Sequence, residues 1–161
     1  VVSIGAVVPG HRPGMTPEEA AIQDELAAVE EAGDPDAIAE ADVRAWVDGP
    51  GQPPDRVPDD IRELVREMDR AINEPGRESG RSLRLQPPAS EQLERLTMPV
   101  LAVCGELDFS CHVATAHFLA ADAPDARAEI VPCVAHLVGL EAPQELAALF
   151  AGFLEPLPPW S

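Results

Sequence analysis

An aspartate and a histidine each follow an apolar run in the second half of the sequence. Asp108 lies four residues after the run Val100 to Cys104, and His136 lies four residues after the run Ala128 to Pro132. A carboxylate can fix the tautomer of an imidazole, so that the other ring nitrogen takes up a proton and returns it. The first chemistry that these residue types indicate is therefore general acid–base catalysis by Asp108 and His136.

The two apolar runs are predicted to be neighbouring strands of a parallel sheet. Residues 100–104 are short, rich in β-branched side chains and bounded by a proline and a glycine, which is typical of a strand buried on both faces. A helix is expected from about Val113 to Ala121, and strand, helix and strand at this spacing predict a right-handed βαβ unit. Since functional groups gather at the carboxyl ends of parallel strands, we expect Asp108 and His136 to lie close together.

The segment from residue 96 to 155 resembles the C-terminal end of the α/β-hydrolases. The resemblance rests on P-V-L-A-V-C-G-E-L-D, which ends at Asp108, on I-V-P-C-V-A-H-L-V-G-L-E-A-P, which contains His136, and on the terminal helix. In that family the acid precedes the histidine along the chain. The resemblance implies that Asp108 matches the acid after the penultimate core strand and that His136 matches the catalytic base after the last one.

The rest of the chain predicts a helical insertion in this fold. Residues 1–8 are expected to be one buried core strand, residues 9–85 a helical insertion, and residues 86–161 a β-α-β-α segment. By resemblance, the insertion is similar to the cap, or lid, of α/β-hydrolases, and we expect Trp46 to be a core residue or a cap wall over a substrate pocket. The predicted fold class is α/β, the C-terminal part of an α/β-hydrolase parallel sheet with an inserted all-helical cap.

Four longer helices are predicted from capping signals and apolar spacing. A capping box at Thr16 and Glu19 opens a helix that runs to about Ala32. A second helix follows Asp34-Pro35 and runs to about Val47. A third opens at Pro58, and the last opens at Pro143.

The family's nucleophile motif, G-x-S-x-G, does not occur in the sequence. The nearest match, Val1 to Gly5, has a valine where the strained elbow needs a small residue, and no helix is predicted after it. We interpret Ser3 as a small side chain in a strand, and Ser79, Ser90, Ser110 and Ser161 lack the motif altogether. Because the chain opens inside a predicted strand without an initiator Met, we expect a piece of a longer protein that lacks its nucleophile and oxyanion hole.

Metal binding is the competing chemistry for the cysteines and histidines. The candidate ligands are Cys104, Cys111, His112, His117, Cys133 and His136. Their spacing matches no standard closed zinc site, and a cysteine inside a buried strand behaves as a small hydrophobic residue. We therefore expect no metal and no cofactor. The two histidines of the predicted crossover helix, at 112 and 117, are expected to be surface or packing residues.

Two glutamates lie near the predicted site. Glu106 precedes Asp108 by two residues and is expected to face solvent or to accept backbone N–H groups, not to act as the catalytic acid. Glu141 follows the histidine loop, and we expect it to cap or orient that loop.

Composition narrows the classes of partner. The formal net charge of −18 argues against nucleic acid and anionic membranes as partners. No apolar stretch reaches the 18 residues or so of a membrane span, and the N-terminus lacks the basic region of a signal peptide. Three cysteines suggest no disulfide framework, so we expect reduced thiols and a cytoplasmic location.

Two functions from different classes follow. The resemblance implies a hydrolase that acts on a small apolar ester, amide or related acyl substrate through a Ser-Asp-His mechanism, in a chain that lacks its nucleophile. The alternative is a catalytically inactive fragment or interaction module. In that case the exposed edge of the first strand would pair with a second copy or with a complementary N-terminal half.

Overall fold

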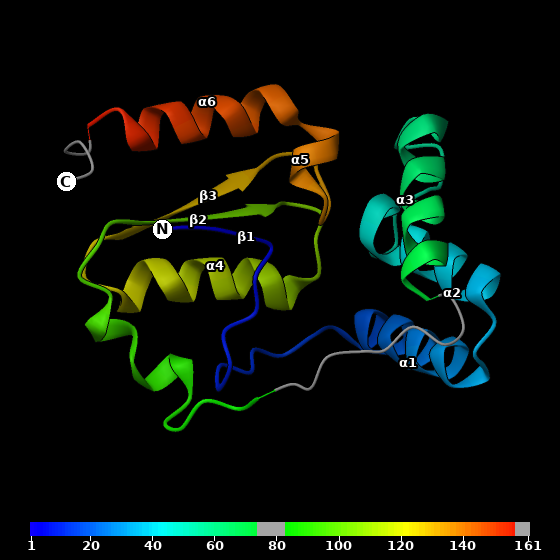
Figure 1. Cartoon of the computed structure of the whole chain (residues 1–161), viewed down its shortest axis with the longest axis horizontal. Helices are drawn as coiled ribbons and strands as arrows, with labels where there is room; N and C mark the ends of the chain where they lie inside the picture. The colour runs from blue at the N-terminus through cyan, green and yellow to red at the C-terminus, as the bar shows by residue number, and fades with distance from the viewer. Residues whose placement is uncertain (74–82, 157–161) are drawn as a thin grey trace.

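The computed structural model describes residues 1–73 and 83–156 and contains one three-stranded parallel sheet. Its strands are β1 (Val2–Ile4), β2 (Val100–Gly105) and β3 (Ala126–Val131), in the order β1-β2-β3. Helix α4 (Ser110–Asp122) covers one face of the sheet and helix α6 (Pro143–Leu154) covers the other (Figure 1). The predicted βαβ unit is confirmed as β2-α4-β3.

The central strand, β2, is buried along its whole length. Leu101 and Val103 belong to the apolar cluster beneath α6, whereas Ala102 and Cys104 belong to the cluster beneath α4. Successive side chains of a strand point to opposite faces, so a strand covered on both sides must be apolar at every position. This requirement explains the continuous apolar run in the sequence.

The first strand is shorter and more exposed than predicted. We expected a buried strand over residues 1–8, but β1 covers only Val2–Ile4, and the side chain of Val7 is 70% exposed. β1 pairs with β2 alone, so one edge has no strand beside it among the described residues. The chain then turns away at Gly5, whose φ of +53° lies in the left-handed region that glycine tolerates best.

Helices and loops, with no strand among the described residues, connect β1 to β2. They are α1 (Pro17–Ala32), α2 (Pro35–Asp42), η1 (Val43–Asp48), α3 (Asp59–Ile72), η2 (Ala89–Glu91) and η3 (Leu93–Arg95). We call residues 9–73 the helical insertion. The predicted insertion extended to residue 85, and residues 74–82 of it lie outside the described part of the chain.

The helix predictions hold, with one difference in winding. The capping box of Thr16 and Glu19 opens α1, and Gly33 ends it in the left-handed conformation. The second predicted helix, to about Val47, is α2 followed by a π-helical turn, η1. Such turns form i→i+5 hydrogen bonds in place of i→i+4 and are frequent at functional sites. Trp46 lies in this turn.

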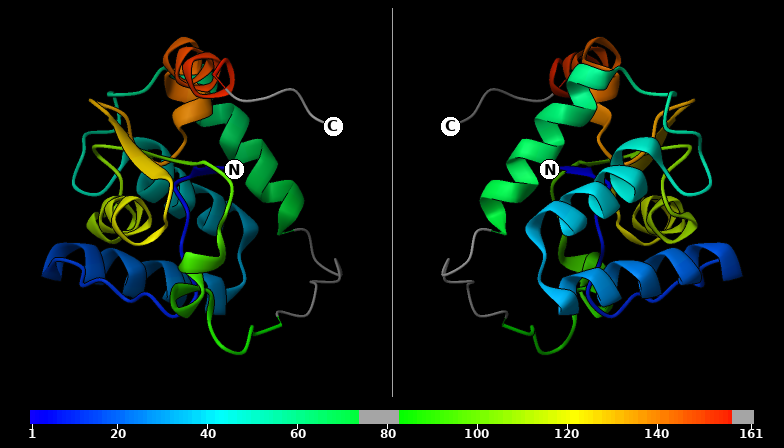
Figure 2. Two further views of the ribbon diagram at one scale, coloured as in Figure 1. Left: turned by 90° about the vertical axis from the view of Figure 1, so that its left-hand side faces the viewer. Right: turned by 90° about the vertical axis from the view of Figure 1, so that its right-hand side faces the viewer.

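The helical insertion lies at the carboxyl ends of the strands, where a short helix, α5 (Val138–Glu141), also lies (Figures 1 and 2). Two apolar clusters join it to the sheet segment. One contains Val43, Val47, Val57, Val65, Ile61, Leu137 and Leu140, and the other contains Leu26, Ala45, Phe109, Ile22, Ala41, Trp46 and Cys111. None of the described helices combines the length and the apolar character that crossing a bilayer requires.

Candidate functional site

Asp108 and His136 lie together at the carboxyl edge of the sheet, as the sequence predicted. Asp108 lies between β2 and α4, two residues before α4 begins, whereas His136 lies in the loop between β3 and α5. The Nδ1 atom of His136 is 2.8 Å from Oδ2 of Asp108. The two parallel strands therefore place a carboxylate and an imidazole in direct hydrogen-bond contact.

The carboxylate of Asp108 is buried and accepts hydrogen bonds on both oxygens. The N–H of Phe109 donates to Oδ1 at 2.7 Å, and the thiol of Cys104 lies 3.4 Å from Oδ2. Burial by itself raises the pKa of Asp108, but hydrogen bonds from His112 and His136 outweigh it, so the pKa lies well below the usual range. Asp108 is therefore ionised at neutral pH.

His112 is a site residue that the sequence analysis missed. We expected it on the surface or in packing, but its Nδ1 atom is 2.8 Å from Oδ1 of Asp108 and its side chain is buried. His117, on the same helix, is exposed as expected. The signal was the spacing: four residues separate Asp108 from His112, and α4 begins between them, so that one helical turn brings the side chains together.

Both imidazoles direct Nδ1 at the same carboxylate. An ionised carboxylate only accepts hydrogen bonds, so each neutral ring carries its proton on Nδ1 and leaves Nε2 as a free acceptor. The side chain of His136 is 26% exposed and that of His112 only 8%. His136 is therefore the ring better placed to exchange a proton with a substrate.

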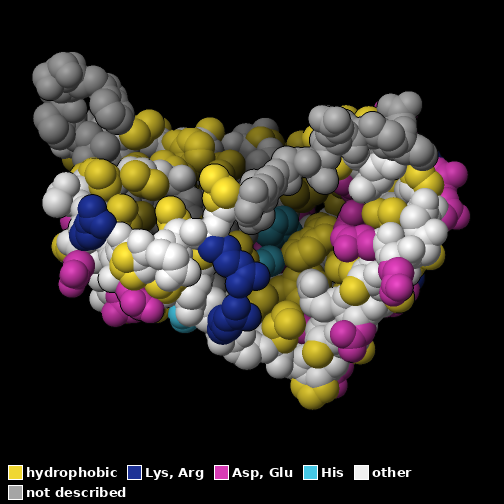
Figure 3. Space-filling view, turned by 60° about the horizontal axis from the view of Figure 1, so that its bottom comes forward, with side chains coloured by type: hydrophobic (Ala, Val, Ile, Leu, Met, Phe, Trp, Pro, Cys, Tyr) yellow, Lys and Arg dark blue, Asp and Glu magenta, His cyan; other side chains and the backbone are white. Residues whose placement is uncertain are grey.

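Trp46 contacts both histidines from the helical insertion. Its ring centroid lies 4.9 Å from that of His136 and 5.8 Å from that of His112. The indole N–H donates to Asp42 at 3.0 Å, which fixes the ring from the far side, and Phe109 packs against it with centroids 4.9 Å apart. Figure 3 shows histidine side chains, bordered by hydrophobic ones, inside a hollow of the surface.

Two glycines make room for the site. A Cβ atom at Gly5 would lie 2.8 Å from Cε1 of His136, so the turn after β1 passes directly beside the imidazole. A Cβ atom at Gly49 would lie 2.8 Å from the carbonyl oxygen of Leu107 and 3.1 Å from Cβ of Ala135. The helical insertion therefore touches both the loop that carries Asp108 and the loop that carries His136.

Glutamates hold the histidine loop in place. Glu141 accepts a hydrogen bond from the N–H of Ala135 at 3.0 Å and forms an ion pair with Arg56 at 2.6 Å. Arg56 in turn donates to the carbonyl oxygen of Cys133 at 3.0 Å, and Glu106 accepts the N–H of Cys133 at 3.0 Å. The expectations that Glu141 orients this loop and that Glu106 accepts a backbone N–H are confirmed.

The candidate nucleophiles lie apart from this arrangement. Ser3 pairs with Ala102 in the sheet, and no hydrogen bond joins it to His136 in the described residues. Ser110 donates its N–H to Glu19, and the N–H of Ser90 donates to Pro9. Ser79 and Ser161 lie outside the described residues. Burial raises the pKa of the Cys104 thiol, which disfavours a thiolate there.

Of the cysteines and histidines considered as metal ligands, the structure gathers two. His112 and His136 form one cluster with Asp108, in which one ligand atom from each residue lies within 4.8 Å of the others. The cluster contains no cysteine and omits His117. It was not predicted, because Asp108 was not among the ligands considered.

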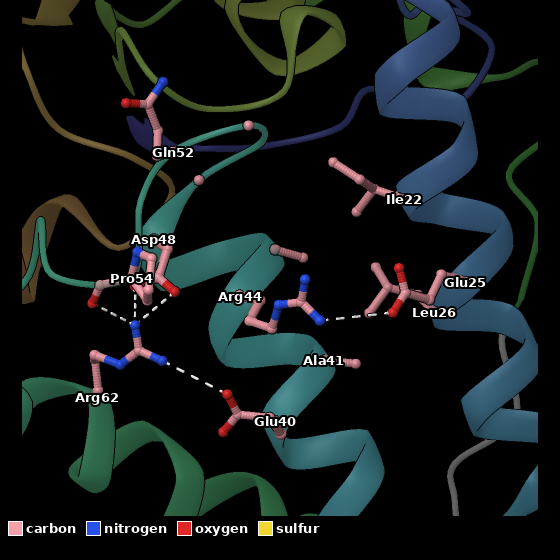
Figure 4. Close-up of a pocket in the computed structure, with 13 residues that line it drawn as sticks. Ile22, Glu25, Leu26, Glu40, Ala41, Arg44, Asp48, Gln52, Pro54 and Arg62 are labelled. Atoms are coloured by element: carbon pink, nitrogen blue, oxygen red, sulfur yellow. Dashed lines mark hydrogen bonds and ion pairs between the residues drawn. The ribbon is translucent and has the colours of Figure 1, made fainter.

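A separate cavity of about 570 Å³ lies within the helical insertion. Its walls combine apolar side chains, such as Ile22 and Leu26, with charged groups, and neither Asp108 nor His136 lines it. Figure 4 shows that Arg44 pairs with Glu25 across it and that Arg62 bonds Asp48, Pro54 and Glu40. The charged groups that line it are thus paired with one another, and the cavity is separate from the Asp108–His136 site.

No protein-family model and no curated protein sequence matches the chain. Several solved structures, however, are similar to the chain in three dimensions. An esterase from a Rhodococcus species is similar with a TM-score of 0.63 and 18% identity, over 98% of this chain and 56% of that one. An α/β-hydrolase from a Medee basin deep-sea metagenome is similar with a TM-score of 0.61 and 17% identity, over 99% and 57%. A carboxylesterase from Bacillus subtilis is similar with a TM-score of 0.57 and 20% identity, over 95% and 50%.

This chain spans about half the length of those proteins. The similarity in three dimensions extends over nearly all of the chain, including the parallel sheet and the helices between its strands. At these identities the likeness shows the fold and leaves the activity to be argued from the site. The chain has part of the α/β-hydrolase fold, in which a helical segment is inserted between two parallel strands.

Proposed function

We propose that this chain supplies the acid and the general base of a Ser-Asp-His hydrolase. In this proposal Asp108 holds the imidazole of His136 in the Nδ1–H tautomer and stabilises the imidazolium ion when it forms. Nε2 of His136 takes the proton from a serine hydroxyl and then gives it to the leaving group. Because the sequence contains no G-x-S-x-G elbow, the serine in this proposal is supplied by another segment or another chain.

The observation that carries the proposal is the 2.8 Å hydrogen bond between His136 Nδ1 and a buried, ionised Asp108. Hydrogen bonds to the other oxygen of such a carboxylate help to keep it oriented toward the imidazole. Phe109 and His112 bond the second oxygen, so the carboxylate is held from both sides. The fold of the similar structures supports the same proposal.

The surroundings of His136 favour a small apolar acyl substrate. Trp46 lies against the imidazole, and Phe109 packs on Trp46. Apolar walls next to a partly exposed base suit an ester, amide or related acyl group with little charge of its own. Under this proposal the helical insertion is the cap of the enzyme, and Trp46 is part of the wall that excludes water.

The proposal is tested with the chain as it stands, on an activated ester. A free imidazole nitrogen that is oriented by a carboxylate should accelerate hydrolysis of p-nitrophenyl acetate even without a serine nucleophile. We expect His136→Asn to lower this rate roughly tenfold or more, while His117→Asn, on the exposed side of α4, leaves it unchanged. Equal rates in both variants would contradict the role of His136 as a base.

A fluorophosphonate probe with intact-mass detection separates base from nucleophile. We expect no covalent adduct, because no serine in the described residues is hydrogen-bonded to His136. A single adduct that His136→Ala abolishes would show an activated serine within this chain, with Ser3 the first to examine, and would overturn the proposal that the serine comes from elsewhere.

The exposed edge of β1 favours a second candidate, an interaction module. Val1 O and Gly5 N bond β2, so Val2 and Ile4 direct their backbone groups toward the open edge. The side chains of Val1 and Ile4 are 56% and 41% exposed. We propose that this edge pairs with a second copy or with a complementary N-terminal half of the same fold.

Light scattering on the purified chain tests whether the edge of β1 pairs with a second copy. We expect a mass above that of the monomer, and Ile4→Pro should restore the monomer because proline removes an outward N–H without touching the bonds to β2. Ile4→Val, which keeps the N–H, is the matched control. A monodisperse monomer at all concentrations would argue against self-pairing.

A further inference from the structure

We infer that Asp108, His112 and His136 form a binding site for a divalent transition-metal ion such as Zn²⁺. The site would hold the ion through one carboxylate oxygen and two imidazole nitrogens. It goes beyond the proposed hydrolysis, since metal binding can be measured whether or not the chain is part of a hydrolase.

The distances between the three ligand atoms support the site. The three ligand atoms lie within 4.8 Å of one another. Zinc binds histidine nitrogen and carboxylate oxygen at about 2.0–2.2 Å, so two ligands of one ion lie at most about 4.4 Å apart. Nδ1 of His112 is 2.8 Å from Oδ1 of Asp108 and Nδ1 of His136 is 2.8 Å from Oδ2, and tetrahedral zinc would ask such pairs to separate by about 0.5 Å. The widest pair, at no more than 4.8 Å, would have to close to about 3.5 Å, so side-chain movements of about 1 Å or less bring the three atoms around one ion.

The donor set is also the one that transition metals prefer. Two imidazoles with one carboxylate suit zinc and iron, and three protein ligands leave a coordination position open for water. Each neutral imidazole must free Nδ1 to bind the ion. It does so by moving its proton to Nε2, so no proton needs to leave the protein.

Access and charge agree with this assignment. With both histidines neutral, Asp108 gives the cluster one negative charge, and its hydrogen-bond partners among the described residues include no arginine. The Asp108 and His112 side chains are almost fully buried, and His136 is 26% exposed, so the ion would enter past His136 and Trp46. Ligands on the rigid ends of β2 and α4 are already oriented before the metal arrives.

A bound ion would occupy the contact that a catalytic base needs. Coordination of His136 through Nδ1 replaces its hydrogen bond to Asp108 and moves its proton to Nε2, the atom that would accept a proton from a nucleophile. The metal-bound and catalytically competent states of this site therefore exclude one another.

The test is a titration of the full chain with Co²⁺ and Zn²⁺, followed by calorimetry and by cobalt absorption. We expect one ion per chain. His112→Asn and His136→Asn should each weaken binding at least about tenfold, since even the outer partners of metal ligands contribute that much. His117→Asn and Cys133→Ser, which alter exposed potential ligands, should change the affinity less than about twofold.

An affinity that is the same in His112→Asn and in the unaltered chain would overturn the inference, as would loss of binding in His117→Asn. Circular dichroism checks that the variants fold. If His112→Asn or His136→Asn does not fold, ¹⁵N spectra of the unaltered chain test whether the ion binds at this site. Zn²⁺ should then shift the Nδ1 resonances of His112 and His136 and leave those of His11 and His117 in place, and any other pattern excludes this site.

Discussion

The helical insertion and the sheet edge hold their buried carboxylates in different ways. In the insertion, Asp48 is 2% exposed, and Nη1 of Arg62 lies 2.7 Å from both of its oxygens. At the sheet edge, Asp108 is paired with two histidines. A guanidinium ion keeps its charge at every physiological pH, whereas an imidazole gains and loses a proton near neutrality. The Asp48 pair is thus held by a permanent positive charge, whereas the partners of Asp108 are rings that can exchange protons.

The largest expected effect lies in the insertion. Arg62→Met leaves the Asp48 carboxylate buried without its partner, and we expect a loss of about 3–5 kcal/mol in the free energy of unfolding. Urea unfolding measures it. Arg44→Ala is the matched control: Arg44 and Glu25 form an exposed pair at 3.7 Å, and its loss should cost less than about 0.5 kcal/mol. Similar losses in both variants would erase the distinction between the two kinds of pair.

The second effect lies at the sheet edge and depends on pH. Asp108→Asn removes charged hydrogen bonds and should cost about 1.5–3 kcal/mol at pH 7. Because the pKa of folded Asp108 lies below the unfolded value of 3.8, its contribution is present above that pH and is lost as the pH falls further. Unfolding followed from pH 7 to pH 2, in EDTA, should show the two proteins converging in acid. A constant difference across that range would mean that the charge of Asp108 contributes nothing.

The third comparison places one substitution in each region. Gly5→Ala and Gly51→Ala both put alanine at positive φ, +53° and +71°, and each should cost about 1–2 kcal/mol in backbone strain. A Cβ atom at Gly51 meets nothing within 4 Å, whereas at Gly5 it meets His136. We therefore expect only Gly5→Ala to shift the imidazole resonances of His136 in NMR spectra. Unchanged resonances would show that the imidazole is not held against the turn.

The smallest effect concerns Asp69, a carboxylate in the insertion whose pKa is raised. Burial, together with the nearby Asp42 carboxylate, raises the pKa of Asp69 to about 6 from its ordinary value of 3.8. A raised acid pKa favours the folded state at low pH and costs stability as the pH rises through about 6. Asp69→Asn should then stabilise the chain at pH 8 by about 1 kcal/mol after solvent screening, and by almost nothing at pH 4. Thermal unfolding at the two pH values measures this. Stabilisation at pH 4 alone would contradict the sign.

The sequence predicts the parts of this molecule that local rules govern. Apolar runs mark β2 and β3, and the capping box at Thr16 marks the start of α1, because each depends on neighbours within a few residues. The Asp108–His136 pair is also predictable, since two parallel strands bring their carboxyl ends to one edge. In the structure, Asp108 and His136 are hydrogen-bonded at this edge.

The remainder depends on contacts that no local pattern encodes. Arg56 reaches Glu141, and Arg62 reaches Asp48, only because the insertion folds back onto the strand ends. His112 was misjudged because its partner became clear only once α4 was known to begin at Ser110. The predicted strand over residues 1–8 was too long, since the apolar run does not reveal that Gly5 turns the chain beside His136.

The contact between Trp46 and the histidines gives the molecule an optical readout. An imidazolium ion next to an excited indole accepts an electron and quenches its emission, whereas a neutral imidazole does so far less. Trp46 and His136 have ring centroids 4.9 Å apart, close enough for such transfer. The sequence contains one other tryptophan, at position 160. In a Trp160→Phe background, the brightness of Trp46 would therefore report the charge of the imidazoles in real time, without an added label.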